Sequence, residues 1–147
     1  SKRAMQSLPA LMRITATKGR LKEDILYMES YTLAENIIKA VSDKKGQDII
    51  LLDIHEKTSI ADYFVICSGS SKIQTKAIAD NIEEKLDKEY GVQVLHREGF
   101  QSGEWILLDY GTVVVQIFQP ETRQYYNLEK LWSDAEQIDV SAILGEE

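Results

Sequence analysis

The chain is poor in the residues that build disulfides and metal sites. It has one cysteine, Cys67, and two histidines, His55 and His96. A single cysteine excludes an intramolecular disulfide and favours a reducing compartment. One thiol and two imidazoles are also too few to make a metal cluster. We therefore expect neither a metal site nor a cofactor held by these side chains.

Long apolar runs are missing as well. Nowhere do about 18 apolar residues follow one another, so the sequence predicts no membrane-spanning helix. The length of 147 residues and the apolar fraction of 44 % suit one domain with a single sizeable core. We expect one folded domain and no association with a membrane.

Basic residues are concentrated at the start of the chain. Residues 1–27 hold six basic and two acidic side chains, whereas residues 28–147 hold 11 basic and 22 acidic ones. A body this acidic repels phosphate backbones, and nucleic-acid binders normally carry a clustered basic patch. The charge therefore favours a basic or neutral protein partner over direct, sequence-specific binding of nucleic acid.

Three segments differ in their residue pattern. Residues 1–27 show little periodicity, and we interpret them as a disordered or added extension, with an organelle transit peptide as the alternative. Residues 28–132 carry the pattern of a folded domain. Residues 133–147 contain five acids and no bases, so we expect a mobile acidic tail.

The patterned region indicates a mixed α/β (α+β) domain. Capping boxes predict one helix from Thr32 and another from Ser71, and Thr122 suits the start of a last helix. Apolar runs predict buried strands, and shorter runs predict further ones. The five predicted strands are Ile49–Leu52, Tyr63–Cys67, Val92–Leu95, Trp105–Leu108 and Val113–Phe118. This order predicts a mixed five-stranded sheet with flanking helices.

Most of the large aromatic residues lie in or near a predicted hairpin. Trp105–Gly111 reads as a strand that runs into a tight turn, with Gly111 supplying the positive φ such turns often need. The segment Arg123–Trp132 adds three more large aromatics, of which Tyr125 is expected to pack on the sheet. Trp and Tyr often anchor interfaces, so the pattern predicts a docking surface. Core packing is the alternative for Trp105 and the preferred interpretation for Trp132.

The turn Ser68–Lys72 allows two interpretations. A glycine and serine turn at a helix N-terminus can hold a phosphate. The common phosphate-binding loop, however, has a longer glycine spacing and places Ser or Thr after its lysine, whereas Ile73 follows here. Ser71 and Gln74 instead match a capping box, which is the interpretation we favour.

The pattern of acids argues against one class of enzyme. The element order is compatible with a nucleotidyltransferase-like architecture. Those enzymes hold Mg²⁺ with a pair of carboxylates two residues apart on a strand. No predicted strand has such a pair, and Asp53 has no acid two residues further on. The fold class is therefore expected without the catalytic carboxylates.

A thiol mechanism is also disfavoured. Cys67 with His55 or His96 could form a nucleophile and a base. Strand alternation, however, places Cys67 on the same face as Tyr63, where a buried thiol acts as a small apolar group. We predict that the protein is not an enzyme and has no catalytic residues.

Five segments, in order and at fitting spacing, carry a family resemblance. They are Lys45–Ile49, Asp62–Gly69, Ala79-Asp80, Trp105–Gly111 and Tyr126–Trp132. Together they resemble the Iojap or ribosomal silencing factor (RsfS) family over Thr32–Trp132. The resemblance implies a silent nucleotidyltransferase-like fold that binds the large ribosomal subunit through its universal protein fourteen. It would thereby block joining of the small subunit and repress translation in the bacterial cytoplasm, or in an organelle if residues 1–27 are a transit peptide.

The resemblance places the docking surface on Trp105 and on the turn of Asp109, Tyr110 and Gly111. We expect the rings of Trp105 and Tyr110 to point outward. Gln116 stands where histidine is common in the family, which excludes an essential strand histidine here. The alternatives that stay open are a metal-dependent nucleotidyltransferase, an RNA-binding module and, for the assembly, a homodimer.

Overall fold

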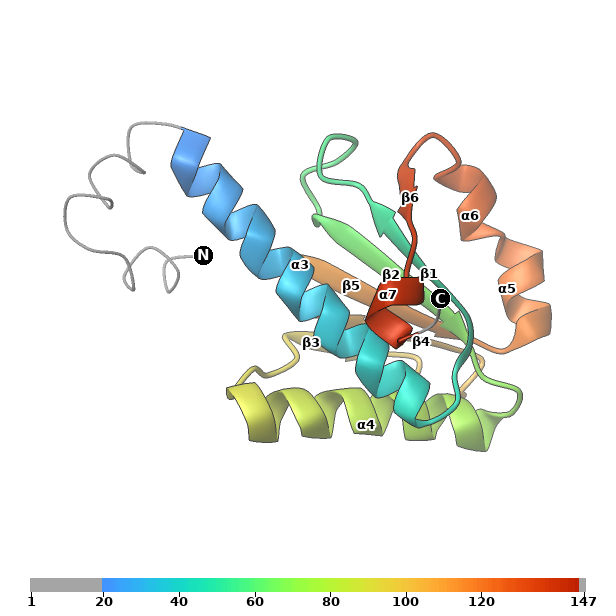
Figure 1. The fold of residues 1–147 in the computed structure, drawn as a ribbon. Coiled ribbons are helices and arrows are strands. Elements are labelled where there is room, and N and C mark those ends of the chain that lie inside the picture. The colour runs from blue at the N-terminus through green and yellow to red at the C-terminus, as the bar shows by residue number, and fades with distance from the viewer. Residues whose placement is uncertain (1–19, 146–147) are drawn as a thin grey trace.

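The structure is a computed structural model that describes residues 20–145, with side chains described from Glu29 onward. Figure 1 shows a central sheet with helices packed around it. The helices are α3 (Arg20–Asp43), α4 (Lys72–Tyr90), α5 (Pro120–Tyr126), α6 (Leu128–Leu131) and α7 (Ser141–Leu144). The strands are β1 (Gln47–Asp53), β2 (Tyr63–Ser68), β3 (His96–Glu98), β4 (Trp105–Asp109), β5 (Val113–Phe118) and β6 (Glu136–Ile138).

The described strands form one mixed sheet in the order β3-β4-β5-β2-β1-β6. The central strands β2 and β5 are parallel, and every other neighbouring pair is antiparallel. Every residue of β2 and of β5 is buried, as expected for strands covered on both faces. The predicted mixed sheet and the hairpin of β4 and β5 are confirmed, whereas the predicted number of five strands is wrong by one.

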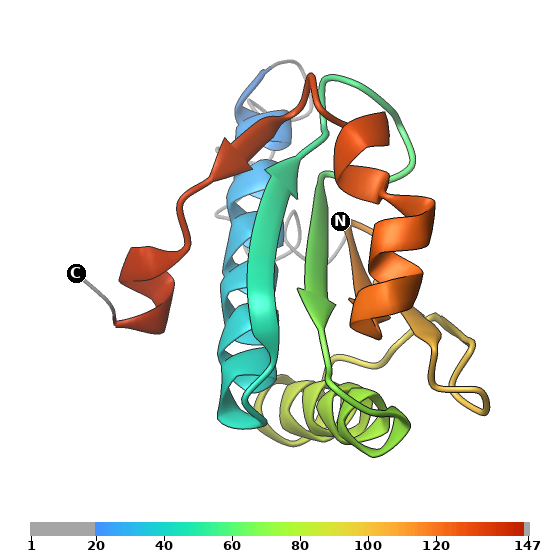
Figure 2. The ribbon, with the colours of Figure 1, turned by 90° about the vertical axis from the view of Figure 1, so that its right-hand side faces the viewer.

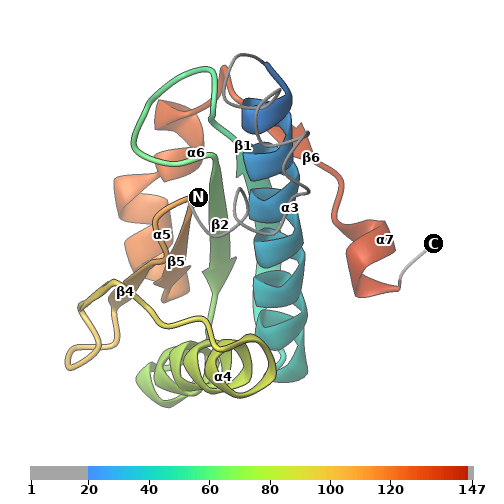
Figure 3. The same ribbon diagram turned by 90° about the vertical axis from the view of Figure 1, so that its left-hand side faces the viewer.

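Strand alternation divides the core into two clusters, one on each face of the sheet. One cluster contains Tyr63 and Cys67 of β2 and packs against α3 and α4. The other contains Phe64 of β2 and Phe118 of β5, together with Leu128 of α6. Figure 2 shows α3 on one side of the central strands and α5 and α6, in orange, on the other. Figure 3 shows the same layers from the opposite side.

Helix α3 begins earlier than the sequence predicts. The predicted N-cap Thr32 lies inside the helix, where its carbonyl accepts a hydrogen bond from Asn36 Nδ2 at 3.0 Å. Residues 20–27, assigned to the extension, therefore belong to α3, while residues 1–19 lie outside the described residues. The apolar side of the helix points into the core, where Ile37, Ile38 and Val41 are buried. A capping-box motif thus does not exclude that a helix continues on its N-terminal side.

The favoured interpretation of the serine-rich turn is confirmed. Ser71 is the N-cap of α4, and its Oγ accepts a hydrogen bond from Gln74 N at 3.1 Å. The Gln74 side chain accepts from Ser70 N at 2.6 Å, one residue before the position expected for a capping box. It also donates to the carbonyls of Lys44 and Lys45, which ties α4 to the end of α3. This turn is built by protein contacts.

The segment expected to be a mobile tail contains the sixth strand. β6 pairs antiparallel with β1, and α7 packs against α3. Ile138 and Val140 supply apolar contacts to the core, so the acidic composition did not indicate the structure formed. The predicted third strand is also displaced, because Leu95 precedes the ladder and β3 starts at His96. None of the helices in the described part of the chain has the length and apolar character needed to cross a bilayer.

Candidate functional site

Strand β4 exposes one of its two faces. Ile106 and Leu108 are buried, whereas Trp105, Leu107 and Asp109 are half-buried. The side chains of Trp105, Leu107 and Asp109 share one face because residues two apart in a strand point the same way. We call these three residues the β4 stripe. The stripe lies on the face of the sheet that α5 and α6 only partly cover (Figure 2).

Trp105 is half-buried and contacts two other aromatic rings. Its ring stacks on Phe118 at 4.8 Å between centroids and contacts Tyr126 of α5 at the same distance. Its Nε1 donates a hydrogen bond to Oε1 of the buried Gln116 at 2.9 Å. Gln116, at the position where histidine is common in the resembled family, therefore accepts the hydrogen bond of the indole N–H. A half-exposed ring with fixed neighbours is the kind of rigid aromatic that can anchor an interface.

Helix α5 extends this surface with two further aromatic rings. Tyr125 is 82 % exposed and Tyr126 is 52 % exposed, and their rings meet edge to face at 5.0 Å. The prediction that Tyr125 packs on the sheet is wrong. The predicted single helix is broken at Asn127, whose φ of 49° lies in the left-handed region. This break changes which residues of the segment face the core.

Some of the residues after Asn127 pack against the core, and others do not. Trp132 packs edge to face on Phe64 with 5.3 Å between ring centroids, but it is only partly buried, as Trp105 is. Leu128 also packs against this cluster. Leu131 of α6, by contrast, is 71 % exposed. The exposed apolar surface is therefore larger on this side than the sequence indicated.

The turn that follows β4 has the predicted geometry. Gly111 adopts a φ of 88°, which glycine tolerates without the steric cost of a side chain. Asp109 Oδ1 accepts a hydrogen bond from Gly111 N at 2.8 Å, and Tyr110 N donates to Val113 O at 2.9 Å. The Asp109 carboxylate thus has a structural role in the turn as well as a half-buried position on the β4 stripe.

Tyr110 does not lie where the sequence predicts. It is only 7 % exposed and packs in the cluster that faces α3 and α4. The expectation that its ring points outward is wrong, because alternation places it on the same side as Ile106 and Leu108. Burial and the nearby charge of Glu83 raise the pKa of its hydroxyl. Tyr110 therefore supports the turn from within the core.

The groups considered for thiol chemistry are separated in the structure. Cys67 is fully buried, and burial raises the pKa of its thiol to about 12. His55 Nδ1 instead contacts Asp53 Oδ1 at 2.6 Å, and this hydrogen bond raises the pKa of His55. His96 is exposed and contacts Glu98. Within residues 29–145, no group of three or more His, Cys, Asp or Glu side chains is placed to hold a metal ion.

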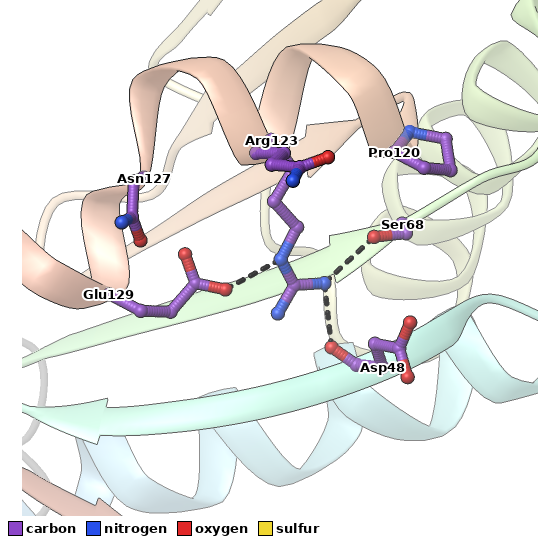
Figure 4. A pocket seen from close by; sticks show the side chains of 7 residues that line it. Asp48, Ser68, Pro120, Arg123, Asn127 and Glu129 are labelled. Carbon is purple, nitrogen blue, oxygen red and sulfur yellow. Dashed lines mark hydrogen bonds and ion pairs between the residues drawn. The ribbon is translucent and has the colours of Figure 1, made fainter.

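A shallow hollow of about 240 Å³ lies where α5 and α6 meet the ends of β1 and β2 (Figure 4). At its centre is Arg123, whose side chain is only 12 % exposed. Its Nε donates to Glu129 Oε1 at 2.7 Å, and its Nη1 donates to Ser68 Oγ and to the Asp48 carbonyl, both at 2.8 Å. No motif in the sequence predicted this arrangement.

The fold and the exposed aromatic face define a mixed α+β domain with a surface suited to docking. The family described as "Ribosomal silencing factor during starvation" matches residues 27–147. The chain belongs to this family, which confirms the resemblance seen in the sequence. The match also includes the segment that the sequence had assigned to a tail.

Individual relatives support the same assignment. The chain is 48 % identical over 101 residues to the ribosomal silencing factor RsfS of Bacillus subtilis, covering 69 % of this chain and 85 % of that protein. It is 38 % identical over 118 residues to RsfS of Halalkalibacterium halodurans, covering 80 % of this chain and all of the relative. A crystal structure of a protein from Chromobacterium violaceum superposes with a TM-score of 0.68 at 42 % identity, covering 70 % of this chain and 85 % of that one.

Two substitutions at Tyr110 test its place in the core. Its hydroxyl is buried with no hydrogen-bond partner among the described residues, so Tyr110→Phe should raise the free energy of unfolding by about 1 kcal/mol. Tyr110→Ala should lower it by about 3 kcal/mol because it leaves a cavity. Urea denaturation measures both changes. Equal stability of the two variants would contradict the buried position.

The reactivity of the lone cysteine is a second check. Because the thiol of Cys67 is buried and its pKa is raised, the folded protein should not react with a disulfide reagent such as Ellman's reagent at about pH 8. One thiol per chain should react once the protein is unfolded in denaturant. Absorbance of the released thiolate reports both. Reaction of the folded protein at the rate of free cysteine would show that Cys67 is accessible.

Proposed function

We propose that this protein is a ribosome-binding repressor of translation that docks on the large ribosomal subunit and blocks association with the small subunit. Membership of the ribosomal silencing factor family supports a role as a ribosome-associated regulator of translation. The observation that carries the docking site is the half-exposed Trp105 on the β4 stripe, held between Phe118 and Tyr126. The proposed partner is the universal protein fourteen of the large subunit.

The chemistry of the surface fits a protein partner. The indole of Trp105 is already fixed by ring contacts and by Gln116, so little rotamer freedom is lost when a partner covers it. Leu107 continues the apolar surface, and Asp109 adds a carboxylate at the far end of the stripe. The acidic body would speed encounter with a basic ribosomal protein and disfavour bare RNA.

The mechanism requires only that the protein occupies a surface of the large subunit, and no covalent bond is made or broken. A domain that sits where the small subunit must bind prevents the two subunits from joining, and the effect depends on affinity and position. Of the predicted contact residues, Trp105, Asp109 and Gly111 keep a direct role in this proposal. Tyr110 supports the turn from below. The protein would act where ribosomes are, in the bacterial cytoplasm or in an organelle if residues 1–27 serve as a transit peptide.

Removal of the Trp105 ring tests the docking site. Trp105→Ala should weaken binding to purified large subunits by about 30-fold, which corresponds to a loss on the order of 2 kcal/mol for a central aromatic anchor. Co-sedimentation measures the affinity, and a second run with small subunits added measures anti-association. The matched control is Ile73→Ala, which removes an exposed apolar side chain from α4 on the other face of the sheet. Wild-type affinity of Trp105→Ala, in a protein that is folded by thermal melting, would remove the proposed site.

Two substitutions of Asp109 test its negative charge separately from its hydrogen bond within the turn. Asp109→Asn keeps an oxygen that can accept the hydrogen bond from Gly111 N but removes the negative charge. If the partner surface is basic, this variant should bind a few-fold more weakly and with a smaller dependence on salt. Asp109→Ala should in addition lower the free energy of unfolding by about 1 kcal/mol because the turn bond is lost. Unchanged affinity and salt dependence in Asp109→Asn would show that the carboxylate acts only within the turn.

A further inference from the structure

Helix α5 carries part of the exposed aromatic surface, yet it has little apolar anchorage of its own. It spans seven residues, none of which is buried. Isolated helices this short are not stable in water, because the cost of nucleation is not recovered over so few hydrogen bonds. Its first turn starts at Pro120 without a side-chain cap. The position of α5 must therefore depend on a few specific contacts.

The largest set of polar contacts is made by Arg123. The guanidinium reaches from α5 toward the sheet and meets three acceptors on three other elements (Figure 4). They are Glu129 on α6, Ser68 at the end of β2 and the carbonyl of Asp48 on β1. A planar guanidinium can serve several acceptors at once, which an ammonium group on a flexible stem does less well. Arg123 thereby connects α5 to the α6 segment and to two strands.

The acceptor on β1 is available because the strand is irregular there. Asp48 has a φ of 49°, and the pairing of β1 with β2 changes register between Gln47 and Ile50. A bulge of this kind leaves backbone groups outside the ladder of the sheet. The Asp48 carbonyl is thus free to accept from Arg123 Nη1 at 2.8 Å. A left-handed residue other than glycine costs free energy, and contacts such as this one offset that cost.

The same helix also touches the candidate docking site. Tyr126, three residues after Arg123, lies 4.8 Å from the Trp105 ring between centroids. The helix therefore spans from the β1 and β2 ends, where Arg123 holds it, to β4, where Tyr126 covers one side of the indole. Displacement of α5 would remove this neighbour from Trp105.

We propose that Arg123 is a positioning residue of the docking surface: it fixes α5 so that Tyr126 holds the Trp105 ring in its binding orientation. This inference rests on the proposed function, because it concerns the same surface. Arg123 itself touches no partner in this scheme. Its effect on binding passes through Tyr126, and that makes the proposal testable by a double-mutant cycle.

The cycle combines Arg123→Gln and Tyr126→Ala, with affinity for purified large subunits as the measurement. Arg123→Gln alone should weaken binding by about tenfold, as expected when a pre-organised surface is loosened. In the Tyr126→Ala background, the same change should weaken binding less than about twofold. Equal fold-losses in both backgrounds would overturn the proposal, because Arg123 would then act independently of Tyr126.

A spectroscopic readout separates positioning from loss of fold. In a Trp132→Phe background, Trp105 is the remaining tryptophan of the chain. Arg123→Gln should change the fluorescence emission of Trp105 in the folded protein, because Tyr126 no longer contacts the indole ring. Arg123→Lys should restore part of the wild-type spectrum. An unchanged spectrum in a folded Arg123→Gln variant would contradict the proposal. If Arg123→Gln does not fold, Ser68→Ala removes one acceptor of Arg123 at the end of β2, two strands from Trp105 in the sheet. This variant should weaken binding by about two- to threefold, and unaltered binding would overturn the proposal.

Failure of this inference can be distinguished from failure of the proposed function. If Trp105→Ala binds large subunits like the wild type, the docking site itself is wrong. If Trp105→Ala binds weakly while Arg123→Gln binds like the wild type, the docking site stands and the role of Arg123 is refuted. The Ile73→Ala control should match the wild type in both assays.

Discussion

The structure depends on the burial of the parallel pair β2 and β5 on both faces. Because every residue of these two strands is buried, the sheet needs helices on each side. The long helices α3 and α4 cover one face. Of the helices in residues 20–145, only α5 and α6, with seven and four residues, cover the other face. This shortage of covering chain leaves the β4 stripe half-exposed, so the candidate docking surface follows directly from the way the core is covered.

The sequence predicted those parts of the fold that rest on local patterns. The apolar runs located β1, β2 and β5, because strands buried on both faces are continuous in hydrophobicity. Ser71 marked the start of α4 through its capping bond. Alternation along β2 also predicted that Cys67 lies in the core, which argues against thiol chemistry. The family resemblance was carried by five such segments and is confirmed.

Features that rest on contacts between distant segments could not be predicted in this way. Periodicity indicated one helix up to Trp132, but the left-handed Asn127 divides it and turns Tyr125 outward. Tyr110 follows the half-buried Asp109 by one residue, so a single step in alternation decides whether its ring is buried. The acceptors of Arg123 lie 55 and 75 residues away in the chain at Ser68 and Asp48, a separation that no spacing rule reaches. β6 was not predicted because it lies in a short segment of acidic composition.

The two outermost strands of the sheet have a consequence for how copies of this protein behave at high concentration. β3 and β6 are three residues each, and β3 consists of His96, Arg97 and Glu98, all exposed. Short, charged borders offer few unpaired amide groups in a row, and a neighbouring chain gains little by adding a strand to them. Fibril-like growth from either border is therefore discouraged. A protein that must keep an aromatic face accessible to its partner can do so more safely when its backbone borders resist aggregation.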